Sequence, residues 1–280
     1  MPTIASMHYV DAGQGGRPVV LLHGNPTSSH IWRRVIPHLT DHGPVLAPDL
    51  IGMGRSARPD IDYRFDDHAR HLEAWCDALG LDDVVLVGHD WGGALALDLA
   101  ARHPGRVAGV ALIETFLRPM TWEIYAPAAV ELFQRLRTPG VGETMALDEN
   151  WFIESSLRLT IPDLSDEDLA VYRTPYPDRD SRRPLLQWPR EIPINGEPAD
   201  VHARVTAYGE WIATTPSVPK LLMLIEPSSG LVQPATEKWA RETIAALEVE
   251  SIGEAGHQAP EQRPDEIGRA VASWLARHDL

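Results

Sequence analysis

The feature that most constrains this chain is an apolar run that ends in a short glycine-rich turn. Val84–Val87 is apolar and largely β-branched, as is typical of a buried strand. Gly88, Asp90 and Gly92 follow at alternate positions, and the alanine- and leucine-rich segment 94–101 predicts a helix. Glycines allow a tight turn between the two elements. The pattern therefore predicts a strand, a sharp turn and a helix, with Asp90 presented at the turn.

The aspartate at this turn indicates nucleophilic chemistry. Gly88-x-Asp90-x-Gly92 resembles the nucleophile elbow of α/β-hydrolases, with a carboxylate in place of a hydroxyl. A serine must lose a proton as it attacks, whereas aspartate is already ionised at neutral pH. It can therefore displace a leaving group from saturated carbon without a base in the first step. The alternative is that Asp90 only caps the helix.

Short apolar strands alternate with helical segments along much of the chain. We expect strands at 7–10, 19–22, 45–49, 84–87, 107–113, 220–225 and 247–252, and helices at 28–39, 65–79, 94–102, 199–213, 235–247 and 264–278. This alternation predicts an α/β fold with a mostly parallel sheet and helices on both faces. Reactive groups gather at the carboxyl ends of such strands, and Asn25, Asp90 and Glu114 each follow one.

The pattern changes between residues 116 and 198, where prolines are frequent and apolar strand runs are missing. Short helices are expected at 128–136 and 166–172. We interpret 116–198 as a helical cap domain inserted into a core domain formed by 1–115 and 199–280. The cap aromatics are candidates to line a pocket, with packing inside the cap as the alternative for each: Trp122, Phe133, Trp151, Phe152 and Trp188.

A carboxylate nucleophile leaves an ester on the enzyme, and a base must activate water to release it. Of the twelve histidines, His257 is the best candidate because it follows the last strand, as the histidine of α/β-hydrolases does. A carboxylate must orient its imidazole. Glu114 is the first candidate and Glu226, at the end of another strand, is the second. Spacing alone does not separate them, and either is also compatible with a solvated loop carboxylate.

Two uncharged donors flank the expected nucleophile. The Trp91 indole N–H donates and never accepts, and the Asn25 amide lies at a neighbouring strand end. Two such donors directed at one point suit a halide leaving group. Backbone N–H groups near Asn25 and Trp91 are candidates for an oxyanion hole. The alternatives are a turn at Asn25-Pro26 and simple packing of Trp91.

Together these residues resemble the haloalkane dehalogenase family. The similar segments are His23–Ser29, Pro48–Gly54, Gly88–Gly92, Trp188–Asp200 and Val218–Lys220. The resemblance implies an α/β-hydrolase fold and hydrolysis of carbon–halogen bonds without metal or cofactor. It implies Asp90 as nucleophile, His257 as base, Glu114 as acid, and Asn25 with Trp91 as the halide-binding pair. The chain departs from the family mainly after His257, where the run Gln258–Gln262 follows instead of the family's usual bulky apolar residues and Gln-Glu-Asp run.

Three other functions remain open. An epoxide hydrolase would share the elbow and needs cap tyrosines, for which Tyr125, Tyr172 and Tyr176 are available. Related epoxide hydrolases, however, usually carry an aromatic residue at the position of Asn25. A cofactor-independent luciferase resembling the marine coelenterazine oxygenases shares nearly the same residues. A ligand-binding receptor is the third, although binding alone needs neither a nucleophile nor a base.

Composition excludes several other classes. The net charge of −15 argues against nucleic acid and anionic membranes as partners, since both favour basic surfaces. A single cysteine, Cys76, excludes an internal disulfide, and no cluster has zinc-ligand spacing. No signal peptide and no membrane-length apolar run is evident, so we expect a cytoplasmic enzyme with a small-molecule substrate. The sequence fits a monomer and a homo-oligomer equally.

Overall fold

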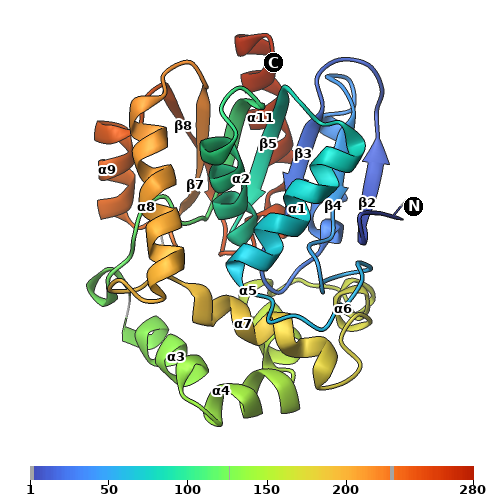
Figure 1. The fold of residues 1–280 in the computed structure, drawn as a ribbon, viewed down its shortest axis with the longest axis vertical. Helices are drawn as coiled ribbons and strands as arrows, with labels where there is room; N and C mark the ends of the chain where they lie inside the picture. Colours follow the sequence, from blue (N-terminus) through green and yellow to red (C-terminus); the bar gives the residue numbers. More distant parts are fainter. Residues whose placement is uncertain (1–2, 126, 228–229) are drawn as a thin grey trace.

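The computed structural model describes residues 3–125, 127–227 and 230–280. Eight strands in this part of the chain form one sheet in the order β1-β2-β4-β3-β5-β6-β7-β8 (Figure 1). They are β1 (Thr3–Ile4), β2 (Met7–Ala12), β3 (Val19–Leu22), β4 (Val45–Pro48), β5 (Val84–His89), β6 (Val107–Ile113), β7 (Lys220–Glu226) and β8 (Leu247–Glu254). β1 pairs antiparallel with β2, and β2 pairs antiparallel with β4. The remaining pairs, among β3 to β8, are parallel. The predicted α/β fold with a mostly parallel sheet is confirmed.

Helices cover both faces of the sheet. One core cluster holds α1 (Phe65–Leu79), α2 (Trp91–Arg102), α8 (Ala199–Thr214) and part of α9 (Pro234–Thr243). The other holds α10 (Ala259–Gln262), α11 (Pro264–His278) and two short 3-10 helices, η1 (Ser29–Trp32) and η2 (Ile36–His38). Val20 and Leu22 pack into the first cluster, and Val19 and Leu21 into the second. Successive residues of a strand point to opposite faces of the sheet. The continuous apolar run of β3 is therefore buried on both faces.

The single helix expected at 28–39 was wrong. The structure has η1 and η2 there, separated by a short turn. Pro37 has no N–H to donate to the carbonyl of residue 33, so a continuous α-helix would lose a hydrogen bond at that point. The Ser28 hydroxyl accepts a hydrogen bond from the His30 N–H and caps η1. Two tight turns therefore replace one longer helix.

The segment between β6 and α8 adds no strand to the sheet in the described residues. It contains η3 (Trp122–Ile124), α3 (Pro127–Arg137), α4 (Val141–Glu143), η4 (Thr144–Asp148), η5 (Phe152–Ser156), α5 (Leu157–Thr160), α6 (Asp166–Arg173), η6 (Asp180–Arg182) and α7 (Arg183–Glu191). Helices α3 to α7 gather at one end of the sheet (Figure 1). None of the helices in the described part of the chain has both the length and the apolar character needed to cross a bilayer.

Candidate active site

Asp90 lies at the turn between β5 and α2, as the glycine pattern predicted. Its φ of 52° and ψ of −125° lie in a region that residues other than glycine rarely adopt. The Thr115 hydroxyl donates a hydrogen bond to the Asp90 carbonyl oxygen over 2.6 Å, and the Asp90 N–H donates to the carbonyl oxygen of Glu114 at 3.2 Å. These bonds fix the strained residue at the carboxyl end of the sheet.

Two glycines make room for this turn. A Cβ atom at Gly24 would lie 2.3 Å from Asp90 Oδ2, and one at Gly92 would lie 2.1 Å from the carbonyl oxygen of Leu22. Neither distance is possible between non-bonded atoms. The close approach of the backbone, as well as the turn itself, therefore requires glycine at these two positions.

The two carboxylate oxygens of Asp90 have different surroundings. Oδ2 accepts a hydrogen bond from the backbone N–H of Asn25 at 2.8 Å, and the backbone N–H of Trp91 also donates to the carboxylate. Oδ1 lies 3.6 Å from Nε2 of His257. Burial raises the pKa of Asp90, and the imidazole and the two N–H groups partly oppose that rise. Oδ2 is thus held by the Asn25 backbone while Oδ1 faces the histidine.

His257 lies between two carboxylates. Its Nδ1 is 3.3 Å from Oε2 of Glu114, while its Nε2 faces Asp90. Burial lowers the pKa of the imidazole, but the hydrogen bond with Glu114 and the charges of both carboxylates outweigh it and raise the pKa above its ordinary value. In this geometry Nδ1 carries the proton toward Glu114, which leaves Nε2 to accept one.

Glu114 is itself held by a loop that sequence reasoning missed. Its Oε2 accepts a hydrogen bond from the Leu231 N–H at 2.9 Å, and a Cβ at Gly230 would lie 1.4 Å from the same oxygen. Glu226, the other candidate, is exposed and accepts a hydrogen bond from the Ser251 hydroxyl. The structure therefore brings Glu114 to His257 and leaves Glu226 outside this group of residues. A lone glycine in a loop gave no sequence signal for this contact.

His89 is a second neighbour of His257 that sequence reasoning did not single out. It is fully buried, and its Nε2 donates to the carbonyl oxygen of His257 at 2.7 Å. Burial lowers the pKa of His89 well below its ordinary value, so the ring is neutral. The two imidazoles lie 5.1 Å apart, centre to centre. His89 thus fixes the backbone of the loop that carries His257.

Asn25 and Trp91 lie beside Asp90 and belong to two different parts of the fold. Asn25 follows β3, and its Nδ2 donates to the carbonyl oxygen of Leu185 at 3.3 Å. The Trp91 indole is 2% exposed and stacks on Trp188 at 4.6 Å, with Phe116 at 4.7 Å on its ring as well. Both side chains line the same cavity as Asp90 and His257.

That cavity has a volume of about 220 Å³ and a mainly apolar wall. Of the five cap aromatics, Phe133, Trp151 and Phe152 line it. Trp122 and Trp188 are not among its lining residues; Trp188 is fully buried against Trp91. The remaining wall includes Asn25, Pro26, Asp90, Trp91, Phe116, Tyr125, Leu132, Leu136, Pro189, Ile192, Leu231, His257 and Gln258. An apolar wall around a few polar groups suits a small apolar substrate.

The three cap tyrosines differ in position. Tyr125 lines the cavity, and its buried hydroxyl has no hydrogen-bond partner among the described residues. Burial raises its pKa. The Tyr172 hydroxyl donates to Glu261, and Tyr176 is buried; neither is a lining residue of this cavity. The structure thus brings one of the three tyrosines to the site.

No group of three or more histidine, cysteine or acidic side chains among the described residues is arranged to hold a metal ion. Cys76 is buried in α1. Burial raises the pKa of its thiol to about 12.

Comparison with known proteins gives a consistent result. The family model described as alpha/beta hydrolase fold matches residues 17–149. A haloalkane dehalogenase of Mesorhizobium japonicum is 49% identical over 278 residues, which cover 97% of this chain and 88% of the relative. A haloalkane dehalogenase of Bradyrhizobium diazoefficiens is 45% identical over 286 residues, covering 97% of this chain and 91% of the relative.

Solved structures are similar over nearly the whole chain. The haloalkane dehalogenase DbeA from Bradyrhizobium elkani superposes with a TM-score of 0.94 at 45% identity, covering 98% of this chain and 94% of that one. The haloalkane dehalogenase DatA from Agrobacterium tumefaciens gives a TM-score of 0.92 at 40% identity, covering 97% and 93%. Likeness of this extent includes both the sheet and the segment between β6 and α8.

Proposed function

This chain belongs to the haloalkane dehalogenases, hydrolases that act on carbon–halide bonds, and on that premise we propose that Asp90 is the nucleophile of its reaction. The observation that supports this role is the unequal environment of the carboxylate. The backbone N–H of Asn25 holds Oδ2, whereas Oδ1 faces His257 in a cavity lined by apolar side chains. Such a carboxylate is oriented for attack through one oxygen only.

In the first step, Asp90 Oδ1 attacks the carbon that bears the halogen. A carbon–oxygen bond forms as the carbon–halogen bond breaks, and the halide leaves with the bonding electron pair. The side-chain N–H groups of Asn25 and Trp91 receive the halide as its charge develops. Because the chain has a net charge of −15, local donors rather than a long-range positive field must stabilise the anion.

In the second step, His257 Nε2 takes a proton from water, which attacks the Cγ carbon of the Asp90 ester. Negative charge develops on Oδ2, where the backbone N–H of Asn25 already donates; the backbone N–H of Trp91 donates to the same carboxylate. Glu114 stabilises the imidazolium. As the intermediate collapses, the bond between Cγ and the alkoxide oxygen breaks and that oxygen takes the proton of the added hydroxyl group, so that the alcohol and the carboxylate form; His257 then gives its proton to solvent. Over the two steps, one haloalkane and one water are converted into one alcohol, one halide and one proton.

We also propose the division of the chain between core and cap. Residues 116–198 supply Phe133, Trp151 and Phe152 to the cavity wall, which supports their role as a cap domain over the core formed by 1–115 and 199–280. The partners are a small halogenated alkane and the released halide, and no cofactor or metal is required by these steps. A cytoplasmic location agrees with the single, buried cysteine.

Halide release from a panel of brominated and chlorinated alkanes tests this function. We expect purified protein to release bromide from short terminal bromoalkanes, and Asp90→Ala to release none while retaining its fold by circular dichroism. Epoxides of the same chain length, assayed for diol formation, provide the comparison. Diol formation together with no halide release across the panel would contradict the proposal.

A substitution of Tyr125 distinguishes haloalkane dehalogenase from epoxide hydrolase activity at this site. An epoxide hydrolase must protonate the epoxide oxygen, and Tyr125 is the one of the three cap tyrosines that lines the cavity. A halide leaving group needs no such proton. Because the Tyr125 hydroxyl has no hydrogen-bond partner among the described residues, we expect Tyr125→Phe to keep halide release within about threefold of the wild type, the lower end of the effect of one neutral hydrogen bond. Loss of turnover well beyond that range would give the tyrosine a chemical role.

A further inference from the structure

Helix α7 of the cap contacts both side chains that are proposed to bind halide. The carbonyl oxygen of Leu185, in its first half, accepts the hydrogen bond from Asn25 Nδ2 at 3.3 Å. The ring of Trp188, one turn further on, stacks on Trp91 at 4.6 Å with an angle of 24° between the ring planes. One short helix therefore touches the donor that follows β3 and the donor that begins α2.

A proline inside α7 explains why the Leu185 carbonyl is available. In an α-helix the N–H of residue i+4 donates to the carbonyl of residue i. For Leu185 that residue is Pro189, which lies inside the helix and has no N–H. The hydrogen bond that would run from residue 189 to residue 185 is missing, and the Asn25 amide donates to this carbonyl instead.

This contact sets the direction of the second Asn25 N–H. A primary amide is planar and carries two N–H donors at a fixed angle. With one donor engaged by the Leu185 carbonyl, the plane of the Asn25 amide is defined and the other donor is left for a ligand. Asn25 itself lines the cavity beside Asp90. Without the acceptor, the amide could rotate and present its oxygen, which would repel an anion.

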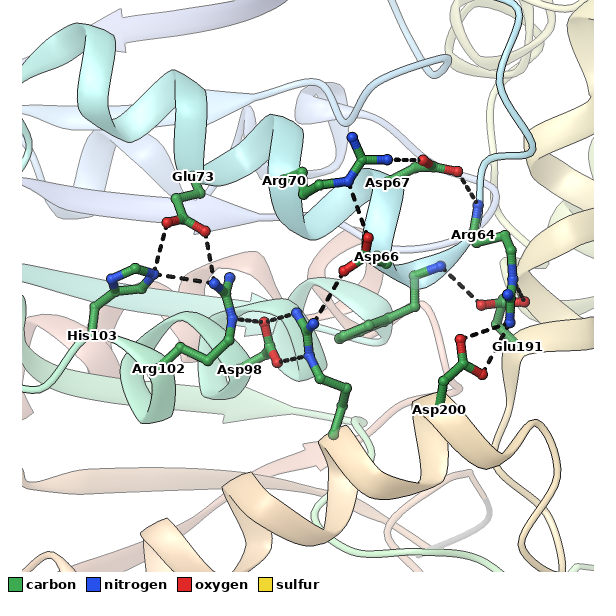
Figure 2. A network of polar contacts seen from close by, with 12 residues as sticks. Arg64, Asp66, Asp67, Arg70, Glu73, Asp98, Arg102, His103, Glu191 and Asp200 are labelled. Carbon is green, nitrogen blue, oxygen red and sulfur yellow. Dashed lines mark hydrogen bonds and ion pairs between the residues drawn. The ribbon is translucent and has the colours of Figure 1, made fainter.

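The far end of α7 is fixed to the core by a buried carboxylate. Glu191 accepts hydrogen bonds from the Phe65 N–H at 2.9 Å and from the Gln187 side chain at 2.7 Å, and Arg64 Nε lies 3.3 Å away. Figure 2 shows Glu191 and Asp200 next to the guanidinium of Arg64 at the start of α1, and both carboxylates pair with it. The carboxylate lies at the N-terminus of α1, where the helix dipole and unpaired N–H groups favour a negative charge.

We propose that α7 orients the Asn25 amide for halide binding, with Pro189 as the positioning residue that frees the Leu185 carbonyl and Glu191 as the anchor that holds the helix in place. This inference rests on the proposed halide-binding role of Asn25. Pro189, which interrupts the hydrogen bonds of α7, thus contributes to halide recognition. Replacing it should stabilise the helix but weaken halide binding.

The test is the affinity for bromide, measured by calorimetry, together with the melting temperature. Pro189→Ala supplies an N–H that competes for the Leu185 carbonyl. We expect its bromide dissociation constant to rise about three- to tenfold, the range of one hydrogen bond, while the melting temperature stays the same or rises because alanine favours a helix. Pro184→Ala is the control, because it replaces the other proline of α7, at the start of the helix, and Pro184 is not a lining residue of the cavity; its bromide affinity should match the wild type.

A second pair of variants keeps the proposal testable if Pro189→Ala does not fold. Glu191→Gln should weaken bromide binding, whereas Asp98→Asn should lower only the melting temperature. Asp98 is also a buried carboxylate of the network in Figure 2, but it pairs with Arg204 and Arg102 and not with α7. Equal bromide affinities for the wild type, Pro189→Ala and Glu191→Gln would overturn the inference.

Asn25→Ala separates this inference from the proposed function. If Asn25→Ala weakens bromide binding and Pro189→Ala does not, Asn25 keeps its role and the positioning by α7 is wrong. If Asn25→Ala binds bromide as tightly as the wild type, the proposed role of Asn25 fails and the positioning role of α7 fails with it.

Discussion

The backbone N–H of Asn25 donates to Oδ2 of Asp90 at 2.8 Å. The same residue also contributes its side-chain amide to the cavity wall. In the proposed reaction, Asn25 therefore acts twice: its side chain receives the halide in the first step, and its backbone stabilises the oxyanion in the second. A substitution at position 25 removes only the side-chain contribution. The backbone donor remains in every variant except proline.

Removal of the His257 imidazole should stop hydrolysis of the ester but leave the alkylation of Asp90 intact. In His257→Phe, Asp90 can still attack the substrate, because its attack needs no base, but water is not activated. We expect about one halide per enzyme molecule, accumulation of alkylated Asp90, and no further turnover. Mass spectrometry of the protein after incubation with a bromoalkane detects the added alkyl group. Unmodified protein after this treatment would contradict the two-step scheme.

The two candidate carboxylates should differ strongly in their effect. Glu114→Gln removes the charge 3.3 Å from His257 Nδ1, and we expect turnover to fall about 10²- to 10⁴-fold, the range of general-base assistance. Glu226→Gln changes an exposed residue that bonds with Ser251, and its turnover should stay near that of the wild type. Steady-state halide release from both variants gives the comparison. The reverse order of effects would move the assignment to Glu226.

The pH dependence of the second step should follow His257. Because its pKa is raised in the free enzyme, the imidazole is protonated, and inactive as a base, up to a higher pH than usual. Esterification removes the negative charge of Asp90, one of the groups that raise this pKa, so the pKa falls when the base is needed. Ester hydrolysis should therefore be lost as pH falls, at a lower pH than the free-enzyme titration of His257.

Rapid-quench measurement distinguishes the two pH profiles. The initial burst of halide reports alkylation, which requires ionised Asp90, and burial raises the pKa of that group from its ordinary value. The steady-state rate reports ester hydrolysis where that step is limiting. The burst should persist at a pH where the steady-state rate has already declined. Identical pH profiles for the burst and the steady-state rate would show that one titration controls both steps.

Gly230 should be intolerant of any side chain. A Cβ there would lie 1.4 Å from Glu114 Oε2, so Gly230→Ala must displace the carboxylate or the loop that carries Leu231. We expect turnover to fall about 10²-fold, as a displacement of about 1 Å at a catalytic group can cause. Gly209→Ala is the control, because Gly209 has no positive φ and the nearest atom to its Cβ would be the carbonyl oxygen of Leu117 at 3.5 Å, an ordinary contact. Full activity of Gly230→Ala would show that this loop yields without moving Glu114.

The sequence alone was sufficient for the features encoded locally. The apolar run before Gly88 and the alternate glycines specify a strand, a turn and Asp90 at its tip, because backbone conformation depends on neighbouring residues. The same reasoning placed α1 and β6 at their observed bounds. It failed at 28–39, where Pro37 divides a segment that otherwise has a helical pattern.

Only the tertiary structure decided which distant groups meet. Glu114 and Glu226 both lie at strand ends in the sequence. The choice between them depends on Gly230 and Leu231, which pack against the Glu114 carboxylate although they lie at least 116 residues further along the chain. The orientation of Asn25 likewise depends on a carbonyl 160 residues away. Such contacts leave no periodic signal, because they arise from the way whole elements pack and not from the spacing of neighbouring residues.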